Sequence, residues 1–224
     1  MSLILQAVLG SEDLLRVRAE FGDVAWSPGK RTAGPAARAV KENLQASADH
    51  PRTQALERFV REALERHPLF EIAARPLRFS RLMFSRYEPG MAYGLHTDDA
   101  LIGSGAGRLR SDLAFTLFLS ESAFYEGGAL VVESALGEQE IRLEAGDAVL
   151  YPAGSVHRVA PVMSGVRFAA VGWVQSVIAD AGQRELLFEL SVARTRLAEA
   201  GVAREELLRL DKAISNLLRM WAQL

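Results

Sequence analysis

The chain has 224 residues, of which 49% are hydrophobic and 24% are charged, the proportions of a globular domain rather than of a disordered or fibrous protein. Its 26 lysines and arginines nearly balance 28 aspartates and glutamates, which argues against a protein that binds nucleic acid through many phosphate contacts. The absence of cysteine excludes disulfides, thiolate metal ligands and cysteine catalysis together. Any bound metal must therefore take His, Asp or Glu as ligands.

The amino-terminal segment does not look like a targeting signal. It lacks a basic start, and Gly10 and Glu12 interrupt its apolar run. Nowhere does the sequence contain the roughly eighteen consecutive apolar residues that a membrane-spanning helix needs. We therefore expect a cytoplasmic protein that binds neither membranes nor nucleic acid.

Residues 1–76 form the first of three regions and show the apolar spacing of helices. Two stripes repeat every three or four residues, one made of Leu14, Val17 and Phe21 and the other of Ala55, Phe59, Val60 and Leu64. Pro51 suits the first turn of the second helix, and residues 26–34 have the composition of a loop. This region is predicted to be a helical support for the rest of the chain.

Residues 77–178 change to short apolar runs punctuated by glycine. Turn signals such as Gly127-Gly128 and Gly146-Asp147 separate the runs, which predict strands over 77–88, 112–119, 129–133, 139–143, 147–151, 157–162 and 166–176. Antiparallel strands at this spacing are typical of a sandwich or barrel, most simply a jelly roll. The predicted fold class is mainly β with flanking α-helices.

Helical spacing returns in residues 179–224. Two stripes are present, the first made of Leu186, Leu190, Ala193 and Leu197 and the second of Leu207, Leu210, Ile214, Leu217 and Trp221. The second stripe has a seven-residue repeat that is too short for a coiled coil by itself. These helices either pack on the core and the amino-terminal helices or form a homodimer interface.

The chemistry-bearing pattern involves two of the 4 histidines. His50 and His67 lie where helices are predicted to begin or end, and the helix dipole explains them there. His96 and Asp98 are two apart, so in an extended segment both side chains lie on one face. His157 comes in a later strand. Two imidazoles and one carboxylate cover one face of an octahedral ion, the arrangement of non-haem Fe(II) oxygenases, whereas the alternative is a pair of hydrogen-bonded core histidines.

Several segments carry a family resemblance. Residues 86–98 read Arg-Tyr-Glu-Pro-Gly-Met-Ala-Tyr-Gly-Leu-His-Thr-Asp and resemble the iron-binding segment of the prolyl 4-hydroxylase branch of Fe(II)/2-oxoglutarate dioxygenases. The bacterial PKHD-type hydroxylases, some of which are associated with iron uptake, are similar to this chain in residues 125–130, 146–167, 172–176, 183–188 and 216–221. The resemblance covers nearly the whole chain. It implies a double-stranded β-helix (jelly-roll) core with amino-terminal and carboxy-terminal helices.

The resemblance also implies a site. Fe(II) would be bound by His96, Asp98 and His157, and 2-oxoglutarate would chelate the metal while Arg167, ten residues after the last ligand, takes its distal carboxylate. A guanidinium suits that task because it is permanently charged and two-pronged. Tyr87 matches a tyrosine that contacts the same carboxylate in the relatives. The alternatives are an exposed strand arginine and a packed aromatic ring.

The activity that follows from the resemblance is oxidative decarboxylation of 2-oxoglutarate to succinate and CO2, with O2 as co-substrate and hydroxylation of a small-molecule or peptide substrate. The family also implies ascorbate, which keeps the iron reduced. Asp98 favours hydroxylation, because related halogenases carry a small residue there. The alternative is a non-catalytic jelly-roll protein that binds iron or a ligand as a sensor or carrier.

Residues 99–110 follow the metal motif and contain Gly103, Gly105 and Gly107 at alternate positions, which predicts a mobile loop at the mouth of the site. The spacing is not that of a dinucleotide-binding motif, and no helix pattern follows it. The nearby cations either face an anionic substrate or form a solvated rim, and they are Lys30, Arg31, Arg108 and Arg110.

Overall fold

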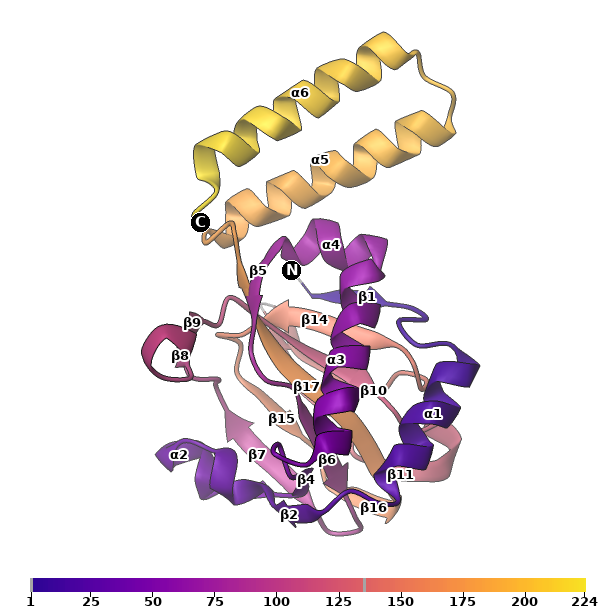
Figure 1. Cartoon of the computed structure of the whole chain (residues 1–224), viewed down its shortest axis with the longest axis vertical. Coiled ribbons are helices and arrows are strands. Elements are labelled where there is room, and N and C mark those ends of the chain that lie inside the picture. The colour runs from indigo at the N-terminus through magenta and orange to yellow at the C-terminus, as the bar shows by residue number, and fades with distance from the viewer. Residues whose placement is uncertain (1, 135) are drawn as a thin grey trace.

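The computed structural model describes residues 2–134 and 136–224 and contains two antiparallel sheets flanked by helices (Figure 1). The larger sheet has eight strands. Its order is β1 (Leu3–Leu5), β14 (Ala148–Pro152), β10 (Leu113–Phe118), β17 (Arg167–Ser176), β6 (Met83–Tyr87), β4 (Leu44–Ala46) and β2 (Trp26–Pro28), with β5 (Pro76–Phe79) also paired to β17. The predicted jelly-roll class is confirmed.

The smaller sheet has five strands in the order β13 (Gly137–Ile141), β12 (Leu130–Ser134), β15 (His157–Val159), β7 (Ala92–His96) and β3 (Lys41–Glu42). Two further strand pairs lie outside both sheets, and these are β11 (Tyr125–Gly127) with β16 (Val162–Gly165) and β8 (Leu101–Ile102) with β9 (Leu109–Arg110). Strands β7 and β15 of the smaller sheet lie opposite strands β6, β10 and β17 of the larger sheet.

Residues 1–76 differ from the prediction of a purely helical region. They contain helices α1 (Ser11–Phe21), α2 (Pro35–Arg38), α3 (Pro51–Arg66) and α4 (Pro68–Ala74), but also strands β1 to β4. Those four strands are two or three residues long, too short to show a period of two. Three of them pair with distant strands of the sheets, and β2 pairs with β4. The amino-terminal region therefore contributes strands to both sheets.

Two predicted strand runs are each divided. The run 77–88 becomes β5 and β6, because Ser80 interrupts the ladder: its hydroxyl accepts a hydrogen bond from Trp173 N at 3.0 Å, and its own amide donates to Trp173 O at 2.9 Å. The run 157–162 becomes β15 and β16, which pair with different neighbours. Both breaks are set by tertiary pairing rather than by local composition.

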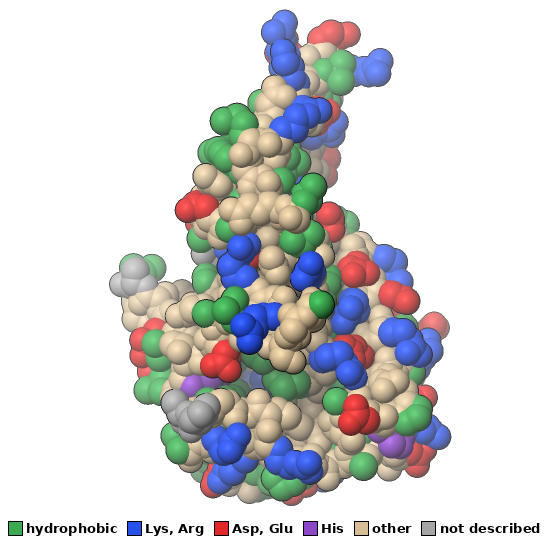
Figure 2. All heavy atoms as spheres, turned by 60° about the vertical axis from the view of Figure 1, so that its left-hand side comes forward, with side chains coloured by type: hydrophobic (Ala, Val, Ile, Leu, Met, Phe, Trp, Pro, Cys, Tyr) green, Lys and Arg blue, Asp and Glu red, His purple; other side chains and the backbone are tan. Residues whose placement is uncertain are grey.

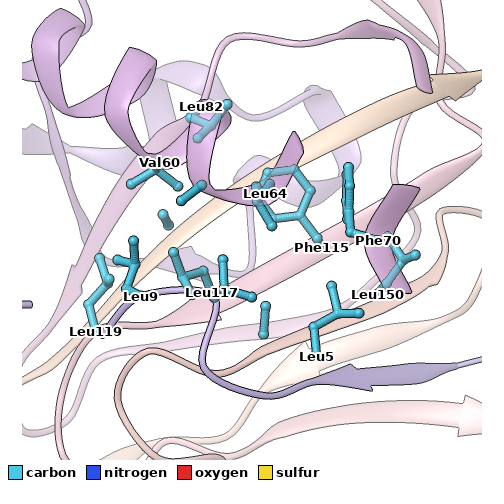
Figure 3. Close-up of a cluster of buried hydrophobic side chains, with 14 of the residues drawn as sticks. Leu5, Leu9, Val60, Leu64, Phe70, Leu82, Phe115, Leu117, Leu119 and Leu150 are labelled. Atoms are coloured by element: carbon cyan, nitrogen blue, oxygen red, sulfur yellow. The ribbon is translucent and has the colours of Figure 1, made fainter. Parts of the chain in front are cut away.

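The hydrophobic core has two layers. One lies between the larger sheet and helices α1, α3 and α4, and Figure 3 shows side chains from it, among them Val60, Leu64, Phe70 and Phe115. The other lies between the sheets and includes Phe118 and Leu130. All six residues of β10 are buried because its alternate side chains serve the two layers. No side chain fits at Gly172, where a Cβ atom would lie 2.7 Å from the Phe115 ring.

The amino-terminal helices bury most of the residues that the spacing marks. Leu14, Val17 and Phe21 of α1 are buried as predicted. Helix α3 begins at Pro51 as predicted, but its buried stripe contains Leu56 and Ala63 besides the predicted Val60 and Leu64, while Ala55 is exposed. His50 and His67 occupy helix ends, and His67 Nδ1 accepts from Phe70 N at 3.4 Å.

The carboxy-terminal region is a hairpin of α5 (Ala181–Glu199) and α6 (Arg204–Trp221) that projects from the sheets (Figure 1). Its base is held by Arg184, whose guanidinium donates to Ile178 O at 2.8 Å, and by Gln223 N, which donates to Val177 O at 2.8 Å. The first turns of α5 pack against α4, whereas α6 has no buried residue. Within the described residues, no helix is long and apolar enough to cross a membrane.

Candidate active site

Three side chains from two strands of the smaller sheet converge at one point. His96 ends β7 and Asp98 follows it, while His157 begins β15 and is the register partner of His96. One ligand atom from each of the three lies within 4.8 Å of the others. The Nε2 atom of His157 is 3.8 Å from an Asp98 carboxylate oxygen, and the two imidazole centroids are 4.2 Å apart. This arrangement can hold a single metal ion.

Backbone carbonyls orient both imidazoles. His96 Nδ1 lies 2.8 Å from Gly94 O, and His157 Nδ1 lies 3.0 Å from Ser155 O. Because a carbonyl only accepts, each Nδ1 carries a hydrogen, and in a neutral ring Nε2 is then the atom that can bind a metal. One carboxylate oxygen of Asp98 is buried with no partner among the described residues. The donor set therefore matches the two neutral imidazoles and one carboxylate that Fe(II) takes in such sites.

The electrostatics of the site also favour a cation. Burial, aided by the neighbouring His157, lowers the pKa of His96 to about 4, so this imidazole is neutral at physiological pH. Burial raises the pKa of Asp98, against the opposing influence of His157. A positive ion at the shared centre would relieve the cost of burying the carboxylate without requiring a charged imidazole.

Arg167 lies inside the protein rather than on an exposed strand face. Its residue is 1% exposed, and Nε and Nη2 have no hydrogen-bond partner in the described part of the chain. The guanidinium lies 5.3 Å from the Tyr87 ring centroid and 5.1 Å from that of Phe118. Gly128, at φ +63°, makes room for it, since a Cβ there would be 2.9 Å from Arg167 Cδ. A buried cation with free donors is suited to an anionic ligand.

Tyr87 is 3% exposed and is the register partner of Arg167 on the adjacent strand. Burial raises the pKa of its phenol, although the charge of Arg167 opposes the shift. The hydroxyl is therefore protonated and able to donate. Since cross-strand partners share a face, one ligand group can contact both side chains.

A cavity of about 640 Å³ lies at the three-ligand cluster and extends to Tyr87. Its wall includes His96, Asp98, His157 and Tyr87, and the predicted mouth loop contributes Asp99, Ile102, Gly103, Gly107 and Leu109. Two cations considered for substrate contact have other partners. Arg110 donates from Nε to Asp112 at 2.6 Å, and Lys30 pairs with Glu42 at 3.4 Å.

Comparison with known proteins identifies the family. The pattern of the 2OG-Fe(II) oxygenase superfamily matches residues 82–175, and that of the PKHD-type hydroxylase C-terminal domain matches residues 181–223. A "PKHD-type hydroxylase" of Synechococcus elongatus is 47% identical over 223 residues, covering 100% of both chains. Another, of Picosynechococcus, is 48% identical over 217 residues and covers 96% of this chain and 97% of its own. The chain belongs to the PKHD-type hydroxylases.

Solved structures agree at the level of the fold. A prolyl hydroxylase of Trichoplax adhaerens superposes with a TM-score of 0.60 at 15% identity, covering 78% of this chain and 83% of its own. The family establishes a hydroxylase that uses Fe(II), 2-oxoglutarate and O2, with ascorbate implied by the family, and the non-catalytic alternative is not favoured. The relatives' names carry no link to iron uptake, so that association stays a prediction.

One wall of the hydroxylase cavity was not predicted from the sequence. Lys41, Asn43 and Gln45 are buried and line it, whereas the intervening Glu42 and Leu44 are not buried. The segment passes from β3 in the smaller sheet to β4 in the larger one, which turns alternate side chains inward. Polar residues at alternate positions are typical of an exposed strand face, so this pattern does not by itself predict a cavity wall.

Because of Lys41, the free energy of unfolding of the metal-free hydroxylase should vary with pH in the alkaline range. Burial, only partly opposed by the charge of Asp98, lowers its pKa from 10.5 to about 8. Between these values the unfolded chain binds more protons, so stability rises with pH. We expect Lys41→Met to be more stable than the wild type at pH 8, and this advantage to shrink by about 3 kcal/mol by pH 10.5. Urea denaturation of both proteins measures the difference, and an advantage independent of pH would contradict the expectation.

Proposed function

We propose that His96, Asp98 and His157 bind the ferrous ion of this hydroxylase and that Arg167 and Tyr87 bind the distal carboxylate of 2-oxoglutarate. The observation that carries the proposal is that one cavity is lined both by the three-ligand cluster and by Tyr87. The ligand atoms of the cluster lie within 4.8 Å of one another. Tyr87 is the register partner of Arg167, which is buried and has unpaired donors among the described residues. An oxygenase of this type needs both, since the metal and the keto acid must meet.

The chain's own groups contribute positioning and exclusion of water. The carbonyls of Gly94 and Ser155 hold the imidazoles through Nδ1, which would leave both Nε2 atoms available to bind the metal. Arg167 and Tyr87 would fix the far end of the keto acid, and apolar side chains such as Leu130 line the space between. When bound, iron and 2-oxoglutarate supply the activation of O2, with release of succinate and CO2 and hydroxylation of the substrate.

Anaerobic addition of Fe(II) and then 2-oxoglutarate to the wild-type protein tests this proposal. A weak visible charge-transfer band should appear only when both are present, because it requires the keto acid to chelate the metal. Admission of O2 should then release succinate. Absence of the band from folded protein would overturn the proposed site.

The prime substrate in this proposal is a small molecule or a peptide side chain, as the cavity volume of about 640 Å³ allows.

We propose that the protein works in the cytoplasm, where 2-oxoglutarate and ferrous iron are available, without a nucleic-acid or membrane partner. Cell fractionation followed by immunodetection checks the location.

We also propose that α5 and α6 form a homodimer interface. The hairpin leaves apolar side chains uncovered. Leu186 and Leu197 of the first stripe remain 47% and 39% exposed, and Leu208 of α6, which lies outside the second stripe, is 51% exposed. Figure 2 shows apolar side chains among the charged ones along this projection. Two hairpins would complete a four-helix arrangement. Light scattering should give twice the 24.5 kDa of one chain, and Leu208→Glu should shift the mass toward the monomer. A monomeric wild type would overturn this proposal.

A further inference from the structure

The ammonium group of Lys41 is enclosed in the cavity without an acidic partner. The residue is 3% exposed and lines the cavity wall. Its Nζ atom donates to Thr32 Oγ1 at 3.2 Å and lies 5.0 Å from the Tyr93 ring centroid. None of the ion pairs among the described residues includes Lys41. A neutral hydroxyl and a ring face replace only part of the water that this charge has lost.

The other charged side chains of the cavity do not compensate Lys41. Arg61 and Arg81 both pair with Glu57, at 3.1 and 2.6 Å, so those three charges form a separate group. Asp99 is exposed at the mouth, where water screens it. Asp98 is the remaining acid, and it belongs to the metal cluster.

When the formal charges of the loaded site are added, the positive charge of Lys41 is in excess. This step rests on the proposed function. The ferrous ion brings two positive charges and Arg167 one. Asp98 and the two carboxylates of 2-oxoglutarate bring three negative charges, which cancel them. Lys41 then adds one positive charge to a buried and otherwise balanced site. Because an unpaired buried charge is costly, its partner is expected to arrive with a ligand.

The position of Lys41 indicates which ligand this is. Lys41 is the register partner of Tyr93, whose ring stacks on His96 with centroids 3.6 Å apart. The Tyr93 ring therefore separates Lys41, on the edge strand of the smaller sheet, from the proposed metal ligand His96. Arg167 and Tyr87 lie in the larger sheet. A group bound by Lys41 is thus beside the reacting centre and is held by a different sheet from the one that carries Arg167 and Tyr87.

Asn43, two residues along the same wall, has further unused capacity. It is 5% exposed and lines the cavity, and neither Oδ1 nor Nδ2 has a hydrogen-bond partner of full geometry in the described part of the chain, although the side chain is close enough to the Tyr87 hydroxyl to act on the pKa of that phenol. A buried amide without partners is uncommon in folded proteins and calls for an explanation such as a missing ligand. The wall therefore offers a positive charge followed by an amide that can donate and accept.

We propose that Lys41 binds a carboxylate of the prime substrate and that Asn43 hydrogen-bonds the polar group next to it. The substrate class is accordingly a carboxylate-bearing small molecule, such as an amino-acid derivative, or the carboxy-terminal residue of a peptide. A neutral carboxamide in place of the carboxylate leaves the ammonium unpaired, so it binds less tightly.

Matched pairs of acid and amide probes test this inference. The N-acetyl derivatives of the common amino acids, each as free acid and as carboxamide, are titrated into the anaerobic Fe(II) and 2-oxoglutarate complex, and perturbation of its visible band reports binding. At least one acid should bind about tenfold or more tightly than its amide, the discrimination expected for a charged hydrogen bond. Lys41→Met should abolish this preference. Lys30→Met, at an exposed lysine of the same region, should preserve it.

A second measurement separates ligand binding from a structural role. Lys41→Met should raise the melting temperature of the metal-free protein, because it removes an unpaired buried charge, and Lys30→Met should leave it unchanged. The inference is overturned if no acid binds more tightly than its amide, if the preference survives Lys41→Met, or if that variant has a lowered melting temperature. Loss of the 2-oxoglutarate band in Lys41→Met also overturns it, because Lys41 would then serve the keto acid. Absence of the band from the wild type instead refutes the proposed function.

Discussion

Asp98→Ala should abolish the visible band that Fe(II) and 2-oxoglutarate produce and should reduce succinate release to background. The substitution removes the carboxylate of the three-ligand cluster and leaves two neutral imidazoles, whose carbonyl contacts hold their geometry but add no charge. Loss of an outer partner of a metal ligand already costs about 10- to 100-fold in affinity, so loss of the ligand itself should weaken Fe(II) binding by at least roughly a hundredfold. Calorimetric titration of Fe(II) under anaerobic conditions measures this.

Asp99→Ala is the matched control for that experiment. The neighbouring carboxylate is exposed at the mouth of the cavity and is not part of the metal cluster. This variant should keep both the band and the Fe(II) affinity. Equal loss in the two variants would show that negative charge near the cavity, rather than ligation by Asp98, supports iron binding.

Arg167→Ala should raise the concentration of 2-oxoglutarate needed for half-saturation by about a hundredfold to several thousandfold, while Fe(II) affinity stays unchanged. Breaking a buried charge pair costs about 3–5 kcal/mol, and each 1.4 kcal/mol is a factor of ten. The guanidinium is enclosed and holds unpaired donors, so water cannot replace it effectively. Titration of the visible band with 2-oxoglutarate measures the shift.

Two controls assign this effect to the distal carboxylate. Pyruvate chelates a metal in the same way but lacks that carboxylate, so its weaker binding should be the same in the wild type and in Arg167→Ala. Arg158→Ala removes a partly exposed arginine of β15 that pairs with Glu138 at 2.8 Å, and it should leave 2-oxoglutarate binding intact. A comparable loss of Fe(II) affinity in Arg167→Ala would count against the proposed role.

Much of the fold was predictable from residue patterns because those patterns are local. The stripe of Leu14, Val17 and Phe21 in α1 and the apolar run of β10 reflect the period of a helix and the burial of both strand faces. Strands β3 and β4 were not predictable in this way. They are two and three residues long, and only their pairing with β7 and β6 makes them strands.

By itself, the sequence determined the chemistry of the candidate ligands. His96, Asp98, His157 and Arg167 are residue types with specific metal-binding and anion-binding capacities. The two-residue spacing of His96 and Asp98 predicts that both side chains lie on one face of an extended segment. Tertiary structure alone decided which other polar groups join them. Lys41 and Asn43 enter the cavity because their segment crosses from one sheet to the other, and this crossing is enforced by pairing with the distant strands β7 and β6. Lys41 is desolvated and lacks an acidic partner only because the fold encloses it, so its capacity to bind an anionic group could not be predicted from residue type or spacing.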